Sequence, residues 1–578
     1  MLRNLLRSAF GPRAQPDTLV SSSLALRREG RLREAEQLLR EAAHQFPRDP
    51  AVATNLGIVL LEQDKGEEGV MSLQRALAID PRYAPAHYNL ANIMRVSGQR
   101  AQAVGHYQAA VDADAGFAHA REELMNCLLE ACDWNRADCV AAELRAMIAN
   151  EAPGRWMRAL SPMTAVMLGL TPAQVKSVSA YHAAECARGI VPVRRDIVLD
   201  APSPVRQARL RVGYLSRDLR DHPVGHVLAN VFALHDRAQF EIYAFSYGGG
   251  DDSSYRKTIE AGVDRFVDGH AMTDGELAAV IAAAGIHVLV DLAGHTTGNR
   301  MGVLARQPAP VQAHYLGFAT TTGAAYIDYF VTDKIATPPS LADGFSEKPA
   351  YVAQCFMVSD GSDAPDIVDR VAAAVDAPFA PDAIVYCNFN NGSRITRDDF
   401  SAWMEILRGV PDSVLWLQGA NALTVGNLRD AAIASGVDAA RLIFAPRVPT
   451  KREHLKRLSR ADLMLDTISW HTGHSSASDA LWAGVPLLTV PGHHFANRVA
   501  ASLATAAGLP ELVRRDRADY VHMAILLGHD RTSLAAAKRK VAERRAPFFD
   551  TRMRVRDLEA AYLQMWEDKC AEMRRAAE

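Results

Sequence analysis

The sequence predicts an α-helical repeat solenoid followed by two α/β domains, each built on a parallel sheet. Small and large apolar residues recur with a fixed period through the first 120 or so residues. From about residue 207, short runs rich in Val, Leu, Ile and Tyr alternate with Ala-rich stretches of helical character. The alternation occurs in two series separated by a Pro-, Asp- and Ala-rich segment around 358–382. We therefore expect two Rossmann-like domains that face a cleft.

The repeat is defined by three registers that agree. Ala35, Gly69 and Ala103 are spaced by 69 − 35 = 34 and 103 − 69 = 34 residues. The same offset links two further sets, which are Leu39, Leu73 and Tyr107, and Ala42, Ala76 and Ala110. Small residues let two helices approach, and proline ends the second helix of a pair. The pattern resembles the tetratricopeptide repeat, with about three copies over 16–118 that would bind peptide or protein in a groove.

The remaining boundaries follow from composition. Residues 1–15 form an Arg-rich amphipathic segment, which fits a transit peptide or, as we favour, a frayed terminal helix. Residues 119–206 continue as a helical cap or linker. We expect the first catalytic lobe over 207–378 and the second over 379–578, including a long amphipathic C-terminal helix that crosses back.

Ten strands are expected from the apolar runs. The first series lies at 210–216, 241–247, 287–294, 311–317 and 329–334, and the second at 383–389, 413–419, 441–447, 463–469 and 486–492. Because helices separate these strands, both sheets should be parallel and covered on both faces.

Composition excludes several classes of protein. Of 578 residues, 49% are apolar, so the chain is not disordered. The net charge is 64 − 67 = −3, which gives no general attraction for nucleic acid or an anionic membrane. The seven cysteines are scattered, with no CxxC pair near histidine, and fit reduced thiols in the cytoplasm. No uncharged apolar run approaches the roughly 20 residues of a membrane span.

The segment HTGHSSASDALWAGVPLLTVPG, residues 471–492, places two histidines and three serines where a helix should begin. Ligands of parallel sheets bind beyond the carboxyl ends of strands, and this segment follows such an end. The free amides near Ser475 and Ser476 would form an anion site. Asp479, one turn further, is placed to accept hydrogen bonds from a ribose diol. The serines alone equally fit an ordinary N-cap, and His474 favours the diphosphate site.

Two further loops of the second lobe carry cations. In RVPTKREHLKR (447–457), Lys451 and His454 share a helix face if the helix starts near Thr450. In NFNNGSRI (388–395), Arg394 would supply a guanidinium suited to phosphate oxygens. Considered alone, Arg394 equally fits a surface arginine, and the 447–457 segment fits a solvated basic turn better than a binding site.

The first lobe offers a histidine and two loops. His222 precedes Pro223, which would start a helix, so the imidazole can act as a general base or donate a hydrogen bond. The loops GHTTGNR (294–300) and LGFATTTG (316–323) carry Thr296 and Gly317, whose hydroxyl and bare backbone would line a sugar or acceptor pocket. Asp291 would orient a histidine there or cap a loop.

Several familiar motifs are missing from the sequence. There is no GxGxxG after a first strand, no GxxxxGK[ST], and no DxD-like pair beside a nucleotide loop. This argues against nicotinamide, flavin and P-loop chemistry, and we expect neither a cofactor nor a metal.

Three stretches resemble the catalytic region of protein O-GlcNAc transferases, which form glycosyltransferase family 41 with their SPINDLY relatives. They are LVDLAGHTTGNRMGVLARQPAPVQAHYLGFATTTG, SVLWLQG and LMLDTISWHTGHSSASDALWAGVPLLTVPG. The resemblance spans about 207–567 and follows a tetratricopeptide array, which is the order of parts in that family. It implies a GT-B fold and an inverting, metal-independent transfer of GlcNAc from UDP-GlcNAc to Ser or Thr of proteins.

The resemblance also implies roles for individual residues. His222 matches the proposed base, and Arg394 serves in catalysis as well as in donor binding. The residues that match nucleotide-sugar contacts are Asn391, Arg394, Pro449, Lys451, His454, His474, Ser475, Ser476 and Asp479.

The chain departs from the family pattern in three ways. Arg394 stands where the better-known members have lysine, RVPTKREH is one residue longer than the animal-type loop, and the repeat array is far shorter. Other readings remain, namely UDP-glucose or GDP-fucose as donor, or a repeat scaffold with a catalytically weak GT-B domain. The HTGHSSASD segment is closer to the GlcNAc branch than to the SPINDLY branch.

Overall fold

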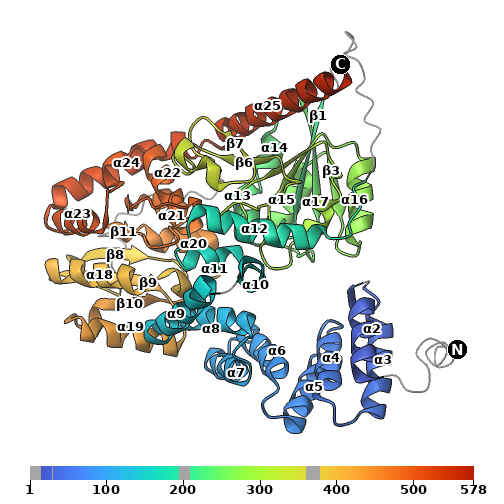
Figure 1. Cartoon of the computed structure of the whole chain (residues 1–578). Coiled ribbons are helices and arrows are strands. Elements are labelled where there is room, and N and C mark those ends of the chain that lie inside the picture. Colours follow the sequence, from blue (N-terminus) through green and yellow to red (C-terminus); the bar gives the residue numbers. More distant parts are fainter. Residues whose placement is uncertain (1–14, 29, 151, 194–208, 359–377) are drawn as a thin grey trace. The chain divides into compact units, whose positions relative to one another are not determined.

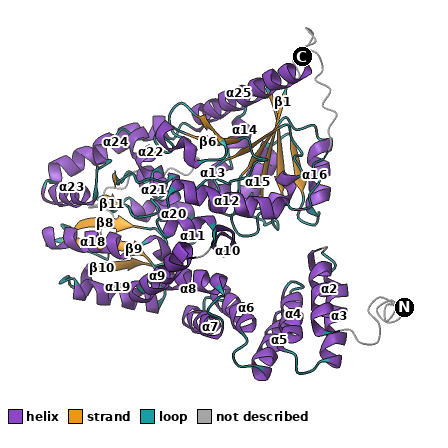
Figure 2. Cartoon of the chain, in the orientation of Figure 1, coloured by secondary structure: helices purple, strands orange, loops and turns teal. Residues whose placement is uncertain are grey.

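The computed structural model describes residues 15–28, 30–150, 152–193, 209–358 and 378–578 (Figures 1 and 2). All but the last residue of the expected N-terminal segment 1–15 lies outside the described residues. The chain divides into two compact units, residues 1–152 and 153–578.

The first unit consists of helix pairs. Its helices are α2 (Pro16–Arg28), α3 (Leu32–Gln45), α4 (Pro50–Leu61), α5 (Gly66–Ile79), α6 (Ala84–Val96), α7 (Arg100–Ala113), α8 (Ala118–Glu130) and α9 (Trp134–Asn150). The first helices of the pairs begin at residues 16, 50, 84 and 118, each 34 residues after the one before. A Cβ atom on Gly57 would lie 2.9 Å from the Gly69 carbonyl oxygen, so α4 and α5 approach as closely as the small residues predicted.

A fourth helix pair, α8 and α9, extends the array beyond the expected boundary at residue 118 to the end of the unit at 152. The 34-residue pattern is hard to recognise in this pair. Ala141 stands where the earlier pairs have a large residue, and Leu144 stands where they have alanine. Both side chains are buried, so the exchange conserves the filled volume.

Within the expected cap segment, residues 153–193 pack on the first lobe of the second unit, and residues 194–206 lie outside the described residues. The helices of this segment are α10 (Pro153–Met157), α11 (Pro162–Met167) and α12 (Pro172–Ala187). The Tyr326 hydroxyl donates to the Ala183 carbonyl at 3.3 Å. A Cβ atom on Gly323 would lie 2.1 Å from the Ala180 nitrogen, so α12 touches the backbone of the lobe.

The first lobe contains a seven-stranded parallel sheet in the order β3-β2-β1-β4-β5-β6-β7. Its strands are β1 (Leu210–Ser216), β2 (Phe240–Ser246), β3 (Arg265–Asp268), β4 (Val288–Asp291), β5 (Val311–His314), β6 (Tyr329–Thr332) and β7 (Lys348–Tyr351). Its helices are α13 (Pro223–Leu228), α14 (Val231–Leu234), α15 (Ser254–Gly262), α16 (Asp274–Ala283), α17 (Met301–Ala305) and η1 (Pro339–Gly344). The five strands expected in this lobe are present, and β3 and β7 are additions at its two edges.

The second lobe contains a five-stranded parallel sheet in the order β10-β9-β8-β11-β12. Its strands are β8 (Ile384–Asn388), β9 (Ser413–Gln418), β10 (Leu442–Ala445), β11 (Leu463–Leu465) and β12 (Leu487–Leu488). The helices are α18 (Arg397–Gly409), α19 (Ala422–Ala434), α20 (Lys451–Leu458), α21 (Ser475–Trp482), α22 (Val499–Ala506), α23 (Arg517–His529) and α24 (Arg531–Phe548), with η3 (Gly392–Arg394), η4 (Ala439–Arg441), η5 (Phe495–Asn497) and η6 (Pro510–Leu512). All five expected strands are present, and the two-lobed architecture is the expected GT-B fold.

The C-terminal helix α25 (Thr551–Ala577) returns to the first lobe, as the sequence predicted (Figure 1). Its Glu559 carboxylate lies 3.1 Å from His235 Nδ1, and its Tyr562 hydroxyl lies 3.1 Å from the Tyr214 hydroxyl. All four side chains are buried, so α25 completes the first lobe's core although it follows the second lobe in sequence.

None of the helices in the described part of the chain is long and apolar enough to cross a membrane. Within the same residues, no group of three or more His, Cys, Asp or Glu side chains is arranged to hold a metal ion.

Candidate functional site

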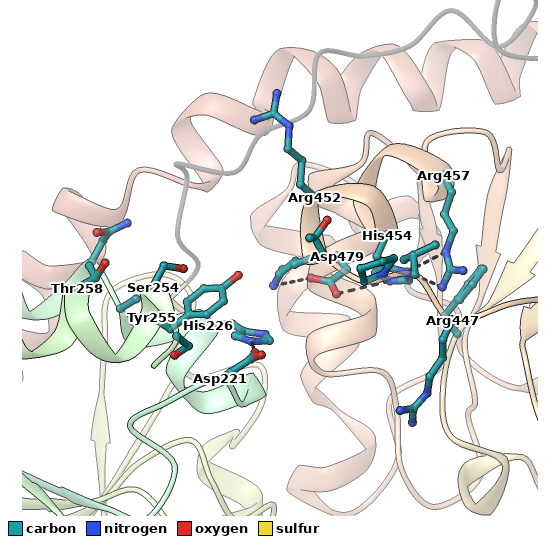
Figure 3. Close-up of a pocket in the computed structure, with 18 of the residues that line it drawn as sticks. Asp221, His226, Ser254, Tyr255, Thr258, Arg447, Arg452, His454, Arg457 and Asp479 are labelled. Carbon is teal, nitrogen blue, oxygen red and sulfur yellow. Dashed lines mark hydrogen bonds and ion pairs between the residues drawn. The ribbon is translucent and has the colours of Figure 1, made fainter. Parts of the chain in front are cut away.

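A cavity of about 850 Å³ lies between the two lobes, at the carboxyl ends of the second lobe's strands (Figure 3). The first lobe contributes residues of α13 and α15, including His226 and Tyr255. The second lobe contributes the loop before α20, the first turns of α20, and Asp479 of α21. Figure 3 shows the two sets of side chains facing one another across the cavity.

Two of the predicted residues, Lys451 and His454, lie on helix α20 and face a third, Asp479. Thr450 caps the helix and forms a capping box with Glu453, so α20 begins where the sequence predicted. Lys451 Nζ lies 3.0 Å from Asp479 Oδ1, and His454 Nε2 lies 3.8 Å from Asp479 Oδ2. The spacing of three residues therefore does bring Lys451 and His454 to one face, and that face meets Asp479.

His454 is held as a neutral ring beside an aromatic ring and a guanidinium, and the Phe389 ring is inclined at 66° to it. The Arg457 guanidinium donates to His454 Nδ1 at 3.0 Å, so Nε2 carries the proton. Burial lowers the pKa of His454, and the charge of Asp479 only partly opposes this effect. The Phe389 ring centroid lies 5.3 Å from that of His454, and Arg457 lies over Phe389 at 5.1 Å. With Pro449 beside it, this end of the cavity suits a planar base and its ribose.

The start of α21 has no side-chain cap. His474 occupies the N-cap position without bonding the helix amides, and its Nε2 lies 3.2 Å from the Ala496 carbonyl. Burial, with the nearby charge of Arg394, lowers the pKa of His474 to about 3, so the ring is neutral. Ser475 and Ser476 are half-buried, and Ser476 donates to Asn390 Oδ1. The first amides of α21 are thus left for an anion.

Arg394 stands close to this helix start. It ends η3, and the described residues give its guanidinium neither a hydrogen bond nor an ion pair. Burial lowers the pKa of Arg394 to about 10, against the raising effect of the Asp466 charge, so the side chain remains cationic at neutral pH. Its charge in turn lowers the pKa values of His471 and His474, which places it beside the 471–474 loop.

The NFNNG motif contains two asparagines with different positions. The predicted residue, Asn391, is exposed, and its side chain accepts a hydrogen bond from the Ser393 amide at 3.2 Å. Asn390 is buried, accepts from Ser476, and donates to the Thr467 hydroxyl at 2.9 Å. The sequence analysis did not single out Asn390. Asparagine beside glycine is typical of a loop, and a second asparagine there gives no further sign of a binding role.

His222 lies on the first-lobe side, next to Asp221 of the cavity wall. It caps α13, and its Nδ1 accepts a hydrogen bond from the Val224 amide at 3.3 Å. Its proton must then sit on Nε2, which makes that nitrogen a donor. Burial lowers the pKa of His222 while Asp218, at 3.8 Å, raises it, and the net shift is downward.

The residues predicted for a sugar or acceptor pocket have internal partners. Asp291 is 2% exposed and accepts hydrogen bonds from His314 Nδ1 at 2.9 Å and the Gly294 amide at 2.7 Å. Its carboxylate therefore orients a histidine and caps a loop at once. Thr296 donates to the Ala293 carbonyl at 2.9 Å. Gly317 passes close to β4, since a Cβ atom there would lie 1.8 Å from the Leu292 carbonyl oxygen.

The chain matches the family model described as glycosyl transferase family 41 over residues 131–377 and 370–558. It is 32% identical to the probable UDP-N-acetylglucosamine–peptide N-acetylglucosaminyltransferase SEC of Arabidopsis thaliana, over 78% of this chain and 47% of that protein. It is 27% identical to the UDP-N-acetylglucosamine–peptide N-acetylglucosaminyltransferase of Caenorhabditis elegans, over 75% and 48%. Identity to the probable enzyme SPINDLY of Petunia hybrida is 28%, over 64% and 40%. The chain thus spans about half the length of the curated relatives it matches.

A solved structure matches nearly the whole chain. A mutant of the Thermobaculum terrenum O-GlcNAc transferase superposes with a TM-score of 0.67 at 28% identity, over 96% of this chain and 98% of that one.

Proposed function

The chain belongs to glycosyl transferase family 41, and from this premise we propose that it transfers N-acetylglucosamine from UDP-N-acetylglucosamine to serine or threonine hydroxyls of proteins. The observation that carries the proposal is the cationic Arg394 beside the uncapped start of α21. One helix turn further, Asp479 joins this anion site to the cavity that suits a nucleoside.

The reaction is a one-step displacement with inversion. The acceptor hydroxyl oxygen forms a bond to the anomeric carbon while the bond from that carbon to the diphosphate breaks, and its electron pair stays on UDP. Groups already aimed at the diphosphate stabilise the charge that UDP gains as it leaves. We assign this role to Arg394 and the amides of residues 474–476, with Lys451, His454 and Asp479 holding the nucleoside. These groups carry the charge without a metal.

The acceptor hydroxyl must also lose its proton during the transfer. His222 serves as a base only if Nδ1 releases the Val224 amide and the proton shifts from Nε2 to Nδ1. In the arrangement described, it positions the acceptor by donating a hydrogen bond, and the hydroxyl proton passes to a phosphate oxygen of the departing UDP or to water.

We assign protein acceptors to the groove of the helix pairs, because stacked repeats of this kind form extended binding surfaces. We place the reaction in the cytoplasm, consistent with the free cysteines of the described residues. The names of the relatives support UDP-N-acetylglucosamine as the donor, and UDP-glucose and GDP-fucose are the alternatives.

A donor screen followed by a turnover assay tests the proposal. Thermal shifts should be largest with UDP-N-acetylglucosamine, and the protein should release UDP and add the sugar to acceptor proteins, seen by mass spectrometry. Arg394→Met should lower turnover by about 10²–10³-fold, because one donor to the developing charge is lost. The exposed neighbour Arg397→Met is the matched control and should keep activity.

Two outcomes would contradict the proposal. Tight UDP binding with no sugar transfer and no UDP release would favour a scaffold. Unchanged kinetics in Arg394→Met would remove this residue from the site.

A further inference from the structure

The carboxylate of Asp466 lies directly beneath the loop that leads into α21. Asp466 follows β11 and is fully buried. Its Oδ1 accepts a hydrogen bond from the Gly473 amide at 2.7 Å, and its Oδ2 accepts one from the Thr489 hydroxyl at 2.7 Å. Both oxygens are therefore used to tie this loop to the neighbouring strand end, and neither faces the cavity.

Gly473 couples the position of this loop to the position of helix α21. A Cβ atom on Gly473 would lie 2.9 Å from Ser476 Oγ and 3.1 Å from the Ala477 nitrogen. The Gly473 backbone thus packs against the first turn of α21 with no room to spare. A displacement of Gly473 must move the amides that the donor's diphosphate would meet.

A second anchor holds the same turn from the other side. Ser476 donates to Asn390, Asn390 donates to the Thr467 hydroxyl at 2.9 Å, and that hydroxyl donates to the His471 carbonyl at 2.7 Å. The start of α21 is therefore fixed by hydrogen bonds to residues that follow β8 and β11. Such a preformed arrangement requires no reorganisation when charge develops.

We propose that Asp466 is a positioning residue of the donor site, which holds the first amides of α21 in place for a diphosphate by binding the Gly473 amide. The inference rests on the proposed function, since it assumes that the donor carries a diphosphate. Asp466 acts through Gly473 and does not touch the donor.

Substitutions at the two ends of β11 test this role. Asp466→Leu removes both acceptors while keeping the branch at Cγ, and Asp466→Asn keeps an acceptor for Gly473. Asp462 is the matched control, because it is a buried carboxylate at the amino end of the same strand that accepts the Val385 amide at 2.8 Å. The readouts are the UDP affinity of the full chain by calorimetry, the donor KM and kcat, and thermal unfolding.

We expect Asp466→Leu to weaken UDP binding by at least about tenfold, since a buried amide loses its acceptor and the loop moves. Asp466→Asn should restore affinity to within about threefold of the wild type. Asp462→Leu should lower the unfolding temperature but leave UDP affinity unchanged. That split separates positioning from a general loss of stability.

If Asp466→Leu does not fold, Thr489→Val decides, because it removes only the second partner of the carboxylate. It should weaken UDP binding about threefold and speed amide exchange over residues 473–478. The inference would be overturned if Asp466→Leu, or Thr489→Val where Asp466→Leu does not fold, bound UDP as tightly as the wild type. A wild-type protein that does not bind UDP would instead overturn the proposed function.

Discussion

His222 shows how one hydrogen bond limits the chemistry of a side chain. The Val224 amide, 3.3 Å from Nδ1, selects the tautomer in which Nε2 is a donor. A general base contributes about 10²–10⁴-fold to a rate, and a side chain that does not accept the proton does not make this contribution. We therefore expect His222→Ala to lose less than tenfold in kcat, with donor affinity nearly intact. A loss of a hundredfold or more in kcat would show that the imidazole ring releases the Val224 amide and accepts the proton.

Asp466 also makes folding stability depend on pH. Burial raises the pKa of Asp466 to about 7, although the hydrogen bonds from Thr489 and Gly473 oppose the shift. Between about pH 4 and pH 7 the folded protein keeps a proton that the unfolded chain has released, so stability falls as pH rises through this window. Below this range the contribution is fully present.

Asp466→Asn should remove this dependence. Relative to the wild type, its free energy of unfolding should increase by up to about 4 kcal/mol between pH 4 and pH 8. Denaturant unfolding of both proteins at the two pH values measures the difference, in which the other titrating groups cancel. A constant difference would mean that Asp466 does not keep its proton in the folded state.

The candidate site illustrates which residues the sequence can reveal. Lys451, His454 and Asp479 were predictable, because helix spacing and strand-end positions bring them together. Asn390, Asp466 and their hydrogen bonds were not, because their partners lie 7 to 86 residues away and depend on the three-dimensional course of the loops.

At the level of elements, apolar runs predicted ten strands and the structure contains all of them. The two strands that sequence reasoning missed, β3 and β7, lie at the edges of the first sheet and contain no buried residue. An edge strand contacts one neighbour only, so it has no need for the apolar run that marks a buried parallel strand. β11 is also shorter than predicted, because Asp466 leaves the sheet to bind Gly473 and Thr489.

The fourth helix pair was missed for a related reason. A period is recognised by residue size at fixed positions, and the exchange of Ala141 and Leu144 keeps the volume but reverses the order of sizes. Packing tolerates such a compensated exchange, whereas a sequence pattern does not reveal it.

At the scale of the whole molecule, the boundary at residue 152 separates the helix pairs from a compact unit that contains both lobes. A chain starting at Pro153 keeps α12, which touches the first lobe at Gly323 and Tyr326. We expect it to fold and to bind UDP like the full chain, but to transfer sugar to proteins at least about tenfold more slowly, because the acceptor groove is lost.

UDP calorimetry and transfer assays on the two chains would measure this separation. Full transfer activity in the shortened chain would show that the helix pairs are dispensable for acceptor recognition. A chain that starts near residue 200 is a poor test, because it also removes α12 from the first lobe.

The return of α25 to the first lobe has a consequence for biosynthesis. Tyr214 and His235 emerge from the ribosome more than 300 residues before Tyr562 and Glu559, their partners. Throughout the intervening translation, the early lobe lacks one wall of its interior. Premature termination before Glu559 therefore damages the lobe made first, and that lobe matures only once α25 has been made.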